Sequence, residues 1–197
     1  MVAIQHGQQI FNMAASFQAT EAGFDHQIDM PPVPPPEGLA DSSGPPAELL
    51  ARLPERARRL FEQPRPFEFR MVQRIDYLRP QPAAPERQIW FRAVDALADD
   101  EMLHRRLLAY VSDFFLLDTA TLPHGTSFLR PGLVMASIDH AMWFHRALRV
   151  DDWLLYAMES PSASGARGFA RASVFARDGR LVASAAQEGL VRSRKDS

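Results

Sequence analysis

Cysteine is missing altogether from this chain of 197 residues. Its absence excludes disulfides, a thiolate nucleophile and any metal site built on thiolates, and it suits a reducing compartment. No apolar run approaches the roughly 20 residues that cross a bilayer. The first residues also lack the basic start and long apolar stretch of a signal peptide. We therefore expect a cytoplasmic protein with no membrane span.

An excess of charge of either sign is also missing. The net charge is −2, and Lys195 is the only lysine among 22 basic residues. Nothing in this balance favours nucleic acid as a partner. A hydrophobic content of 46% and a charged content of 23% are ordinary for a globular protein. The length allows one good core, or one domain together with a piece of another.

The familiar catalytic motifs are absent as well. The sequence contains no G-x-S-x-G, no glycine-rich phosphate loop, no G-x-G-x-x-G and no H-E-x-x-H. Its six histidines are scattered, and His140 and His145 stand five residues apart, which suits neither a helix face nor one strand face for a metal. We expect no metal and no cofactor, and we interpret these histidines as structural.

Proline is concentrated in one stretch, residues 25–48. Because proline fixes φ and lacks a backbone donor, this stretch is predicted to be an extended linker. Before it, residues 2–5 and 9–18 flank a short turn and predict a hairpin, which alone is marginally stable. We therefore predict three parts: a hairpin from another domain at 1–24, a linker at 25–48 and the main domain at 49–197.

The rest of the chain predicts an α+β fold, with one central helix wrapped by a single antiparallel sheet. Helical spacing covers Ala47 to Gln63 and Met102 to about Leu117, and the acids at 99–101 suit the N-terminus of the second helix. Asp178-Gly179 is a strong hairpin signal between the last two strands. The strands are expected at 67–73, 86–94, 132–146, 153–164, 167–177 and 180–192.

Three polar residues stand in apolar company. Asp113 lies near the end of the predicted central helix, Ser137 in the strand at 132–146 and Gln187 in the last strand. A buried lone carboxylate is costly unless it is hydrogen-bonded, so Asp113 is either functional or caps a neighbouring group. By pattern alone, Gln187 is as well explained by a polar bridge in the core, and Ser137 is unremarkable.

Four segments carry a resemblance: IFNMAASFQATEAGFDHQ, YVSDFFLLDTATLPHG, ASIDHAMWFHR and the stretch from DDWLLYAMES to QEGLVR. They resemble the acyl-CoA thioesterase II family (TesB-type) over essentially the whole chain. The resemblance implies a double hotdog, in which two hotdog folds each wrap an antiparallel sheet around a long helix. It also implies hydrolysis of acyl-CoA thioesters to a free fatty acid and CoA.

The resemblance also implies a site of three residues. By motif, the family's aspartate falls on Asp113, its hydroxyl residue on Ser137 and its glutamine on Gln187. Such a set would orient and activate a water, with the aspartate as general base and no acyl-enzyme. CoA would then be part of the substrate rather than a cofactor. Asp139 and His140 are adjacent in a predicted strand, so we expect them to point to opposite faces and not to act as a dyad. His140 is interpreted as a structural residue or as one that supports the site without contacting the substrate.

The sequence departs from the family pattern at its start. It begins inside what resembles the last hairpin of a first hotdog, so a truncated double hotdog is expected, with a homo-oligomer formed through the hotdog sheets. Two functions stay open: a working thioesterase, or a remnant that binds acyl-CoA or a partner chain without turnover. A hotdog hydratase ranks last, because no Asp-plus-His pair stands at the start of the central helix.

Overall fold

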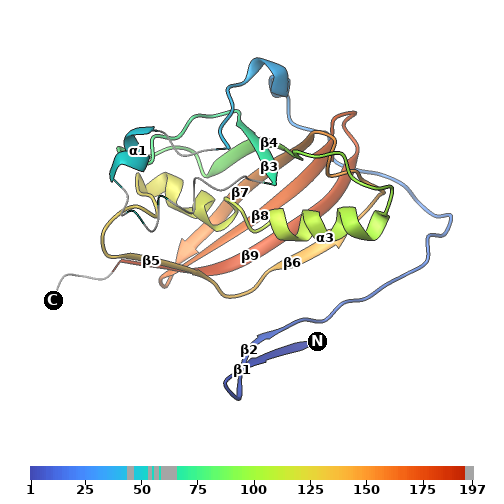
Figure 1. The fold of residues 1–197 in the computed structure, drawn as a ribbon, viewed down its shortest axis with the longest axis horizontal. Helices are drawn as coiled ribbons and strands as arrows, with labels where there is room; N and C mark the ends of the chain where they lie inside the picture. The colour runs from blue at the N-terminus through green and yellow to red at the C-terminus, as the bar shows by residue number, and fades with distance from the viewer. Residues whose placement is uncertain (44–46, 53–54, 56–57, 59–65, 194–197) are drawn as a thin grey trace.

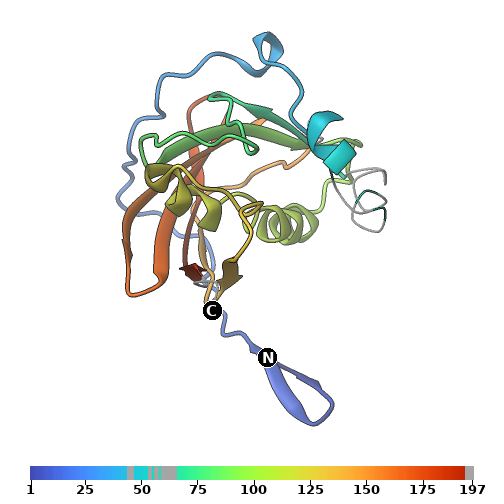
Figure 2. The same cartoon turned by 90° about the vertical axis from the view of Figure 1, so that its left-hand side faces the viewer.

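The structure is a computed structural model that describes residues 1–43, 47–52, 55, 58 and 66–193. The central feature is one curved antiparallel sheet that wraps around a helix, as Figures 1 and 2 show from two directions. The predicted α+β arrangement is confirmed.

The main sheet has seven strands in the order β3-β4-β7-β8-β9-β5, and β6 also pairs with β9. Every pairing is antiparallel. The sequence of residues 88–93 alternates between apolar side chains and side chains that carry polar atoms, and β4 follows this pattern: Ile89 and Phe91 are buried in the main core, whereas Trp90 faces the other side of the sheet. The strands are β3 (Phe67–Met71), β4 (Glu86–Ala93), β5 (Leu133–Ser137), β6 (Ala141–Phe144), β7 (Leu154–Ser164), β8 (Arg167–Ala176) and β9 (Leu181–Ser193).

The central helix α3 (Glu101–Val111) lies against the concave side of the sheet (Figure 2). Asp100 caps it by accepting hydrogen bonds from the two backbone N–H groups at 102 and 103. The helix ends at Val111 rather than near Leu117, so the predicted length is wrong. Phe115 adopts a left-handed φ of 66°, a conformation that no helix continues through.

A second helical segment, η2 (Leu117–His124), follows this break and ends at Gly125 with φ 55°. The sequence analysis expected only a connection here. Gly168 and Gly189 let η2 lie unusually close to the sheet, because a Cβ on Gly189 would lie 2.3 Å from Leu117 Cδ2 and one on Gly168 would lie 2.7 Å from the Cβ of Ala120. Glycine is therefore required at these two sheet positions by close approach.

The Asp178-Gly179 turn joins β8 and β9 as predicted, with Gly179 at φ 89°. The strand expected over 132–146 is two strands, β5 and β6. Between them the backbone N–H groups of Ile138 and Asp139 both donate to the Glu188 carbonyl, and the Asp139 carboxylate accepts from the Glu188 N–H. A side chain that takes the place of a ladder partner interrupts the pairing at this point.

At the N-terminus, β1 (Val2–Gln5) and β2 (Gln8–Asn12) form a two-stranded sheet of their own. The hairpin stands apart from the main sheet in both views (Figures 1 and 2). Its second strand ends at Asn12, well before residue 18. The division of the chain at 24 and 48, and the origin of the hairpin in another domain, stay predictions.

The proline-rich segment is extended, as expected, and it lies against the outer face of the sheet. The Trp90 Nε1 donates to the Pro34 carbonyl at 2.9 Å. Gln27 holds the β8–β9 turn through its amide, which donates to the Gly179 carbonyl and accepts from the Leu181 N–H. Three side chains of the segment pack against a small apolar cluster on this face: Met30, Val33 and Leu39.

Two short helical pieces complete the segment, η1 (Pro36–Gly38) and α1 (Ala47–Arg52). The helix expected from Ala47 to Gln63 thus begins where predicted, and most of its second half lies outside the described residues. Between the two pieces, the Ser42 N–H donates to the Phe69 carbonyl at 2.8 Å and the Ser43 Oγ accepts from the Phe69 N–H at 2.8 Å. These two serines occupy the outer hydrogen-bonding positions of edge strand β3.

Candidate active site

The three residues singled out in the sequence lie within hydrogen-bond distance of one another. Asp113 stands in the turn after α3, Ser137 ends β5, and Gln187 lies in the inner face of β9. The Gln187 Nε2 donates to Asp113 Oδ1 at 2.5 Å and to the Ser137 Oγ at 3.1 Å. The Ser137 hydroxyl also points to Asp113 Oδ1, at a longer 3.4 Å.

Strand register explains how Ser137 reaches the other two. Ser137 pairs with Gly189, two residues beyond Gln187 on the same face of β9. Asp113 arrives from the opposite layer, because α3 ends at Val111 and the chain turns back toward the sheet. Three distant segments therefore meet at the inner edge of β9.

The three side chains differ in their exposure to solvent. Gln187 is fully buried, whereas Asp113 and Ser137 are exposed. The amide orientation is set by charge, since a donating Nε2 stabilises the carboxylate and an amide oxygen in its place would repel it. Asp113 Oδ1 is occupied by these contacts, and no hydrogen bond to Oδ2 is recorded among the described residues. This arrangement can hold a water at an oriented carboxylate that faces solvent.

The nearby titratable groups shift as burial dictates. Burial, reinforced by the Asp113 carboxylate, raises the pKa of the Tyr156 phenol far above its usual range, so Tyr156 stays protonated and acts as a donor. Burial lowers the pKa of His140 below its ordinary value of 6.5, although the carboxylates of Asp113 and Asp139 oppose this. A neutral imidazole therefore accompanies the site at neutral pH.

Asp139 and His140 do not pair with each other, in agreement with the sequence analysis, although the reason differs. They lie in the break between β5 and β6 rather than within one strand. Asp139 accepts from the Glu188 N–H at 2.8 Å, and His140 Nε2 contacts the Ser112 Oγ at 2.8 Å. The sequence analysis did not single out Ser112, for which a polar residue directly before Asp113 at a helix end was the available signal.

Metal ligands do not gather in the part of the chain that the structure describes, where no three His, Asp or Glu side chains are close enough to share an ion. The three candidate side chains are a carboxylate, a hydroxyl and an amide, and they are hydrogen-bonded to one another. Groups of this kind suit hydrogen bonds to a water or to a carbonyl group.

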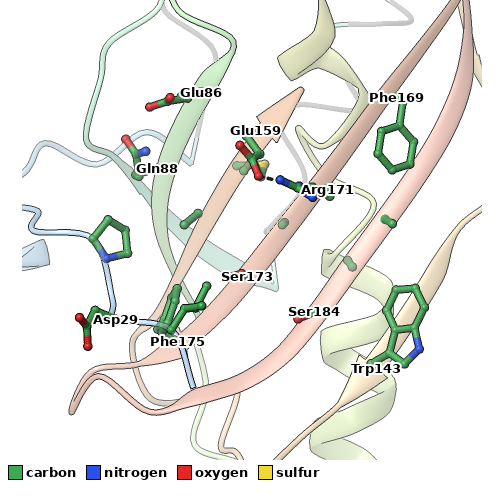
Figure 3. A pocket seen from close by; sticks show the side chains of 17 residues that line it. Asp29, Glu86, Gln88, Trp143, Glu159, Phe169, Arg171, Ser173, Phe175 and Ser184 are labelled. Atoms are coloured by element: carbon green, nitrogen blue, oxygen red, sulfur yellow. Dashed lines mark hydrogen bonds and ion pairs between the residues drawn. The ribbon is translucent and has the colours of Figure 1, made fainter. Parts of the chain in front are cut away.

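A groove of about 650 Å³ lies on the outer face of the sheet, away from the candidate site (Figure 3). It runs between Asp29 in the proline-rich segment and Trp143 in β6, and the ion pair of Glu159 with Arg171 crosses it. Asp113, Ser137 and Gln187 do not line it. The groove and the three-residue group are thus separate features on opposite faces of one sheet.

Comparison with known proteins gives the family. The model of the acyl-CoA thioesterase family matches residues 56–190. The chain belongs to this family. It is 40% identical over 190 residues to acyl-CoA thioesterase 2 of Haemophilus influenzae, a match that covers 96% of this chain and 66% of the relative. It is 38% identical to human acyl-coenzyme A thioesterase 8, over 96% of this chain and 61% of the relative.

Solved structures agree with the assignment to the acyl-CoA thioesterases. The crystal structure of the acyl-CoA thioesterase II TesB2 from Mycobacterium marinum is 42% identical, with a TM-score of 0.78, over 98% of this chain and 67% of that one. A hot dog fold protein from Alicyclobacillus acidocaldarius, 17% identical, superposes with a TM-score of 0.61 over 98% of this chain and 66% of that one. The expected hotdog fold is thereby confirmed.

Two further findings concern the length of the chain and its helices. The chain spans 61% to 66% of the length of the curated thioesterases named above. Among the described residues, no helix of this family member is long and apolar enough to cross a membrane.

Proposed function

We propose that this chain hydrolyses acyl-CoA thioesters to a free fatty acid and CoA, using a water activated by Asp113, Ser137 and Gln187. The observation that carries the proposal is the sharing of one carboxylate oxygen, Asp113 Oδ1, between the Gln187 amide and the Ser137 hydroxyl. Two donors on one oxygen orient the carboxylate and leave Oδ2 to accept from a water. Membership of the acyl-CoA thioesterase family supports the choice of substrate.

The reaction needs no covalent enzyme intermediate. Asp113 accepts a proton as the water oxygen attacks the thioester carbonyl carbon, and the two N–H groups of Gln187, donated to Asp113 Oδ1 and to the Ser137 Oγ, keep the carboxylate oriented for this step. The tetrahedral intermediate collapses, the carbon–sulfur bond breaks, and the CoA thiolate takes the proton back from Asp113. The three proposed catalytic groups are side chains of this chain, and CoA is part of the substrate.

A thiol-release assay across acyl-CoA chain lengths tests this proposal. Asp113→Asn keeps the shape of the side chain but removes the proton acceptor, and we expect kcat to fall by about 10²- to 10⁴-fold with little change in KM. Asp152→Asn, at an exposed acid far along the chain from this group, is the matched control and should leave kcat unchanged. Equal rates in the two variants would refute the role of Asp113.

The hydroxyl makes a second, independent test. Ser137→Ala removes the group that contacts both partners and should lower kcat, whereas Ser137→Thr keeps the hydroxyl and restricts its rotamer, so activity should survive. A threonine variant as slow as the alanine variant would contradict the hydrogen-bonding role.

The second candidate function is binding of acyl-CoA or of a partner chain without turnover. It is favoured by exposed apolar side chains at one end of the sheet, namely Ile138, Trp143 and Phe144. These residues lie in or beside β6, beyond which no further strand is described. We propose that a second copy of the chain associates through this edge, as exposed apolar patches beside open strand edges favour.

Protein concentration separates the two candidates. A thioesterase completed by self-association should release CoA at a specific rate that rises with protein concentration, together with a larger size in solution. A binding remnant should release no CoA above background at any concentration while it still binds acyl-CoA.

A further inference from the structure

Ser112, the residue directly before Asp113, has every polar atom engaged. It is 1% exposed and caps the C-terminus of α3, where its N–H donates to the Leu108 carbonyl at 2.9 Å. Its carbonyl accepts from the Tyr156 hydroxyl at 2.6 Å. Its own hydroxyl contacts the Ala109 carbonyl at 2.9 Å and His140 Nε2 at 2.8 Å. Contacts with α3, with Tyr156 and with His140 therefore all fix the position of Ser112.

The hydroxyl of Ser112 can bond to His140 with either nitrogen of the ring protonated. Ser112 has one hydroxyl proton, and the Ala109 carbonyl is a stronger acceptor for it than the thioether of Met142, which lies 3.1 Å away. With that proton donated to the Ala109 carbonyl, the Ser112 oxygen accepts from His140 Nε2–H; with the proton donated to His140 instead, Nε2 accepts and the bond persists in the other direction. Burial keeps the imidazole neutral at neutral pH, despite the carboxylates of Asp113 and Asp139, and a neutral ring with its proton on Nε2 satisfies this bond.

The bond connects the two parts of the chain that supply the exposed residues of the candidate site. His140 comes three residues after Ser137, in the break between β5 and β6, and Ser112 comes one residue before Asp113. A contact between Ser112 and His140 therefore ties the turn that holds the carboxylate to the segment that holds the hydroxyl. Tyr156, which is buried in β7, fixes the same turn from the centre of the sheet.

We propose that His140, acting through Ser112 and together with Tyr156, is a positioning residue that holds the Asp113 carboxylate within reach of Gln187 and Ser137. It does not touch the reacting atoms. The proposal rests on the proposed hydrolase function and assigns His140 a role in it. It chooses between the two interpretations left open by the sequence, a structural histidine or one that supports the site without contacting the substrate.

Steady-state kinetics with a matched histidine provide the test. His140→Ala should lower kcat on the order of 10- to 100-fold, because a small displacement of a reacting group has a large effect on rate. KM should change little, since the substrate contacts are untouched. His145→Ala is the control: its Nε2 also contacts a serine hydroxyl at 2.8 Å, that of Ser184, but on the outer face, so kcat should be unchanged.

Rescue and coupling separate positioning from a general loss of stability. His140→Gln replaces Nε2–H with an amide donor and should recover most of the lost kcat. The double variant of His140→Ala with Ser112→Ala should be no slower than the slower single variant, because both remove one bond. Additive losses, or a glutamine variant as slow as the alanine variant, would overturn the proposal.

Two further measurements keep the test decisive. If the alanine variant does not fold, the imidazole ¹⁵N spectra of the unmodified protein and of Ser112→Ala are compared, and an Nε2 signal of His140 that is the same in both overturns the proposed bond. Tyr156→Phe removes a single O–H and should also lower kcat. If the unmodified protein has no activity, the proposed hydrolase function itself fails. If Asp113→Asn abolishes turnover while His140→Ala matches its control, only the positioning role fails.

Discussion

A methyl group added at Gly189 would strike the segment that lies against the sheet. Its Cβ would lie 2.3 Å from Leu117 Cδ2, 2.7 Å from Leu117 Cδ1 and 3.0 Å from the Ala136 carbonyl oxygen. Real Cβ atoms essentially never approach this closely, so either Leu117 or β9 must shift. Overpacking of this kind typically costs about 1–3 kcal/mol. Gly189→Ala should therefore lower the free energy of unfolding by about 2 kcal/mol.

Urea denaturation measures this loss. For a slope of about 1–3 kcal/mol per molar urea, a loss of about 2 kcal/mol moves the midpoint by about 1 M. Gly23→Ala, at a position where a Cβ meets nothing within 4 Å, is the control and should leave the midpoint unchanged. Because Gly189 pairs with Ser137 and follows Gln187 by two residues, kcat should also fall in Gly189→Ala.

A second substitution decides whether the clash is the cause. Leu117→Ala alone should cost about 2–5 kcal/mol, as large-to-small changes in a core do. Combined with Gly189→Ala it should cost clearly less than the sum of the two, because the new methyl group enters the space that Leu117 leaves. Additive losses, or a Gly189→Ala midpoint equal to that of the control, would refute the reasoning.

Three other outcomes are expected. Arg87→Met should lower the free energy of unfolding by about 3–5 kcal/mol, because it leaves Asp118 without its buried partner. The double change with Asp118→Leu should cost less than this single change, and a larger loss in the double variant would count against the ion pair. Gln27→Ala removes both bonds to the β8–β9 turn and should cost about 1 kcal/mol in urea denaturation, whereas an unchanged midpoint would show that the segment is held by packing alone. Burial lowers the pKa of both His140 and His145 below 6.5, so the folded chain binds fewer protons than the unfolded chain below that pH. Stability should therefore be complete above pH 6.5 and fall as the pH drops below it, an effect that the double glutamine variant should reduce.

Elements with local signals could be predicted from the sequence. Asp178-Gly179 forms the expected hairpin because Gly179 supplies the positive φ that the turn requires. The alternation in β4 also follows directly from the pattern. The separation of α3 from η2 could not be predicted, because Phe115 between them adopts a left-handed conformation, which a bulky residue adopts only under tertiary constraint.

The candidate site could also be predicted only in part. Pattern alone left Asp113, Ser137 and Gln187 open to structural explanations, and only the family resemblance joined them. Their proximity depends on register between β5 and β9, and on where the turn after α3 lies, neither of which a single sequence encodes locally. The break at Ile138 to His140 was missed for a related reason, since it depends on a contact with Glu188, about 50 residues away in the chain.

The two ends of the seven-stranded sheet differ in a way that bears on how copies can join. At β3, Ser42 and Ser43 already occupy the positions where another strand would bond, whereas β5 and β6 end the described sheet at its far side. A sheet edge whose outer hydrogen-bonding positions are already paired is less able to bind another strand than an edge whose positions are open. Two copies joined at the β5 and β6 edge, as proposed above, would each keep only the β3 edge of the main sheet, where Ser42 and Ser43 oppose the addition of a further copy.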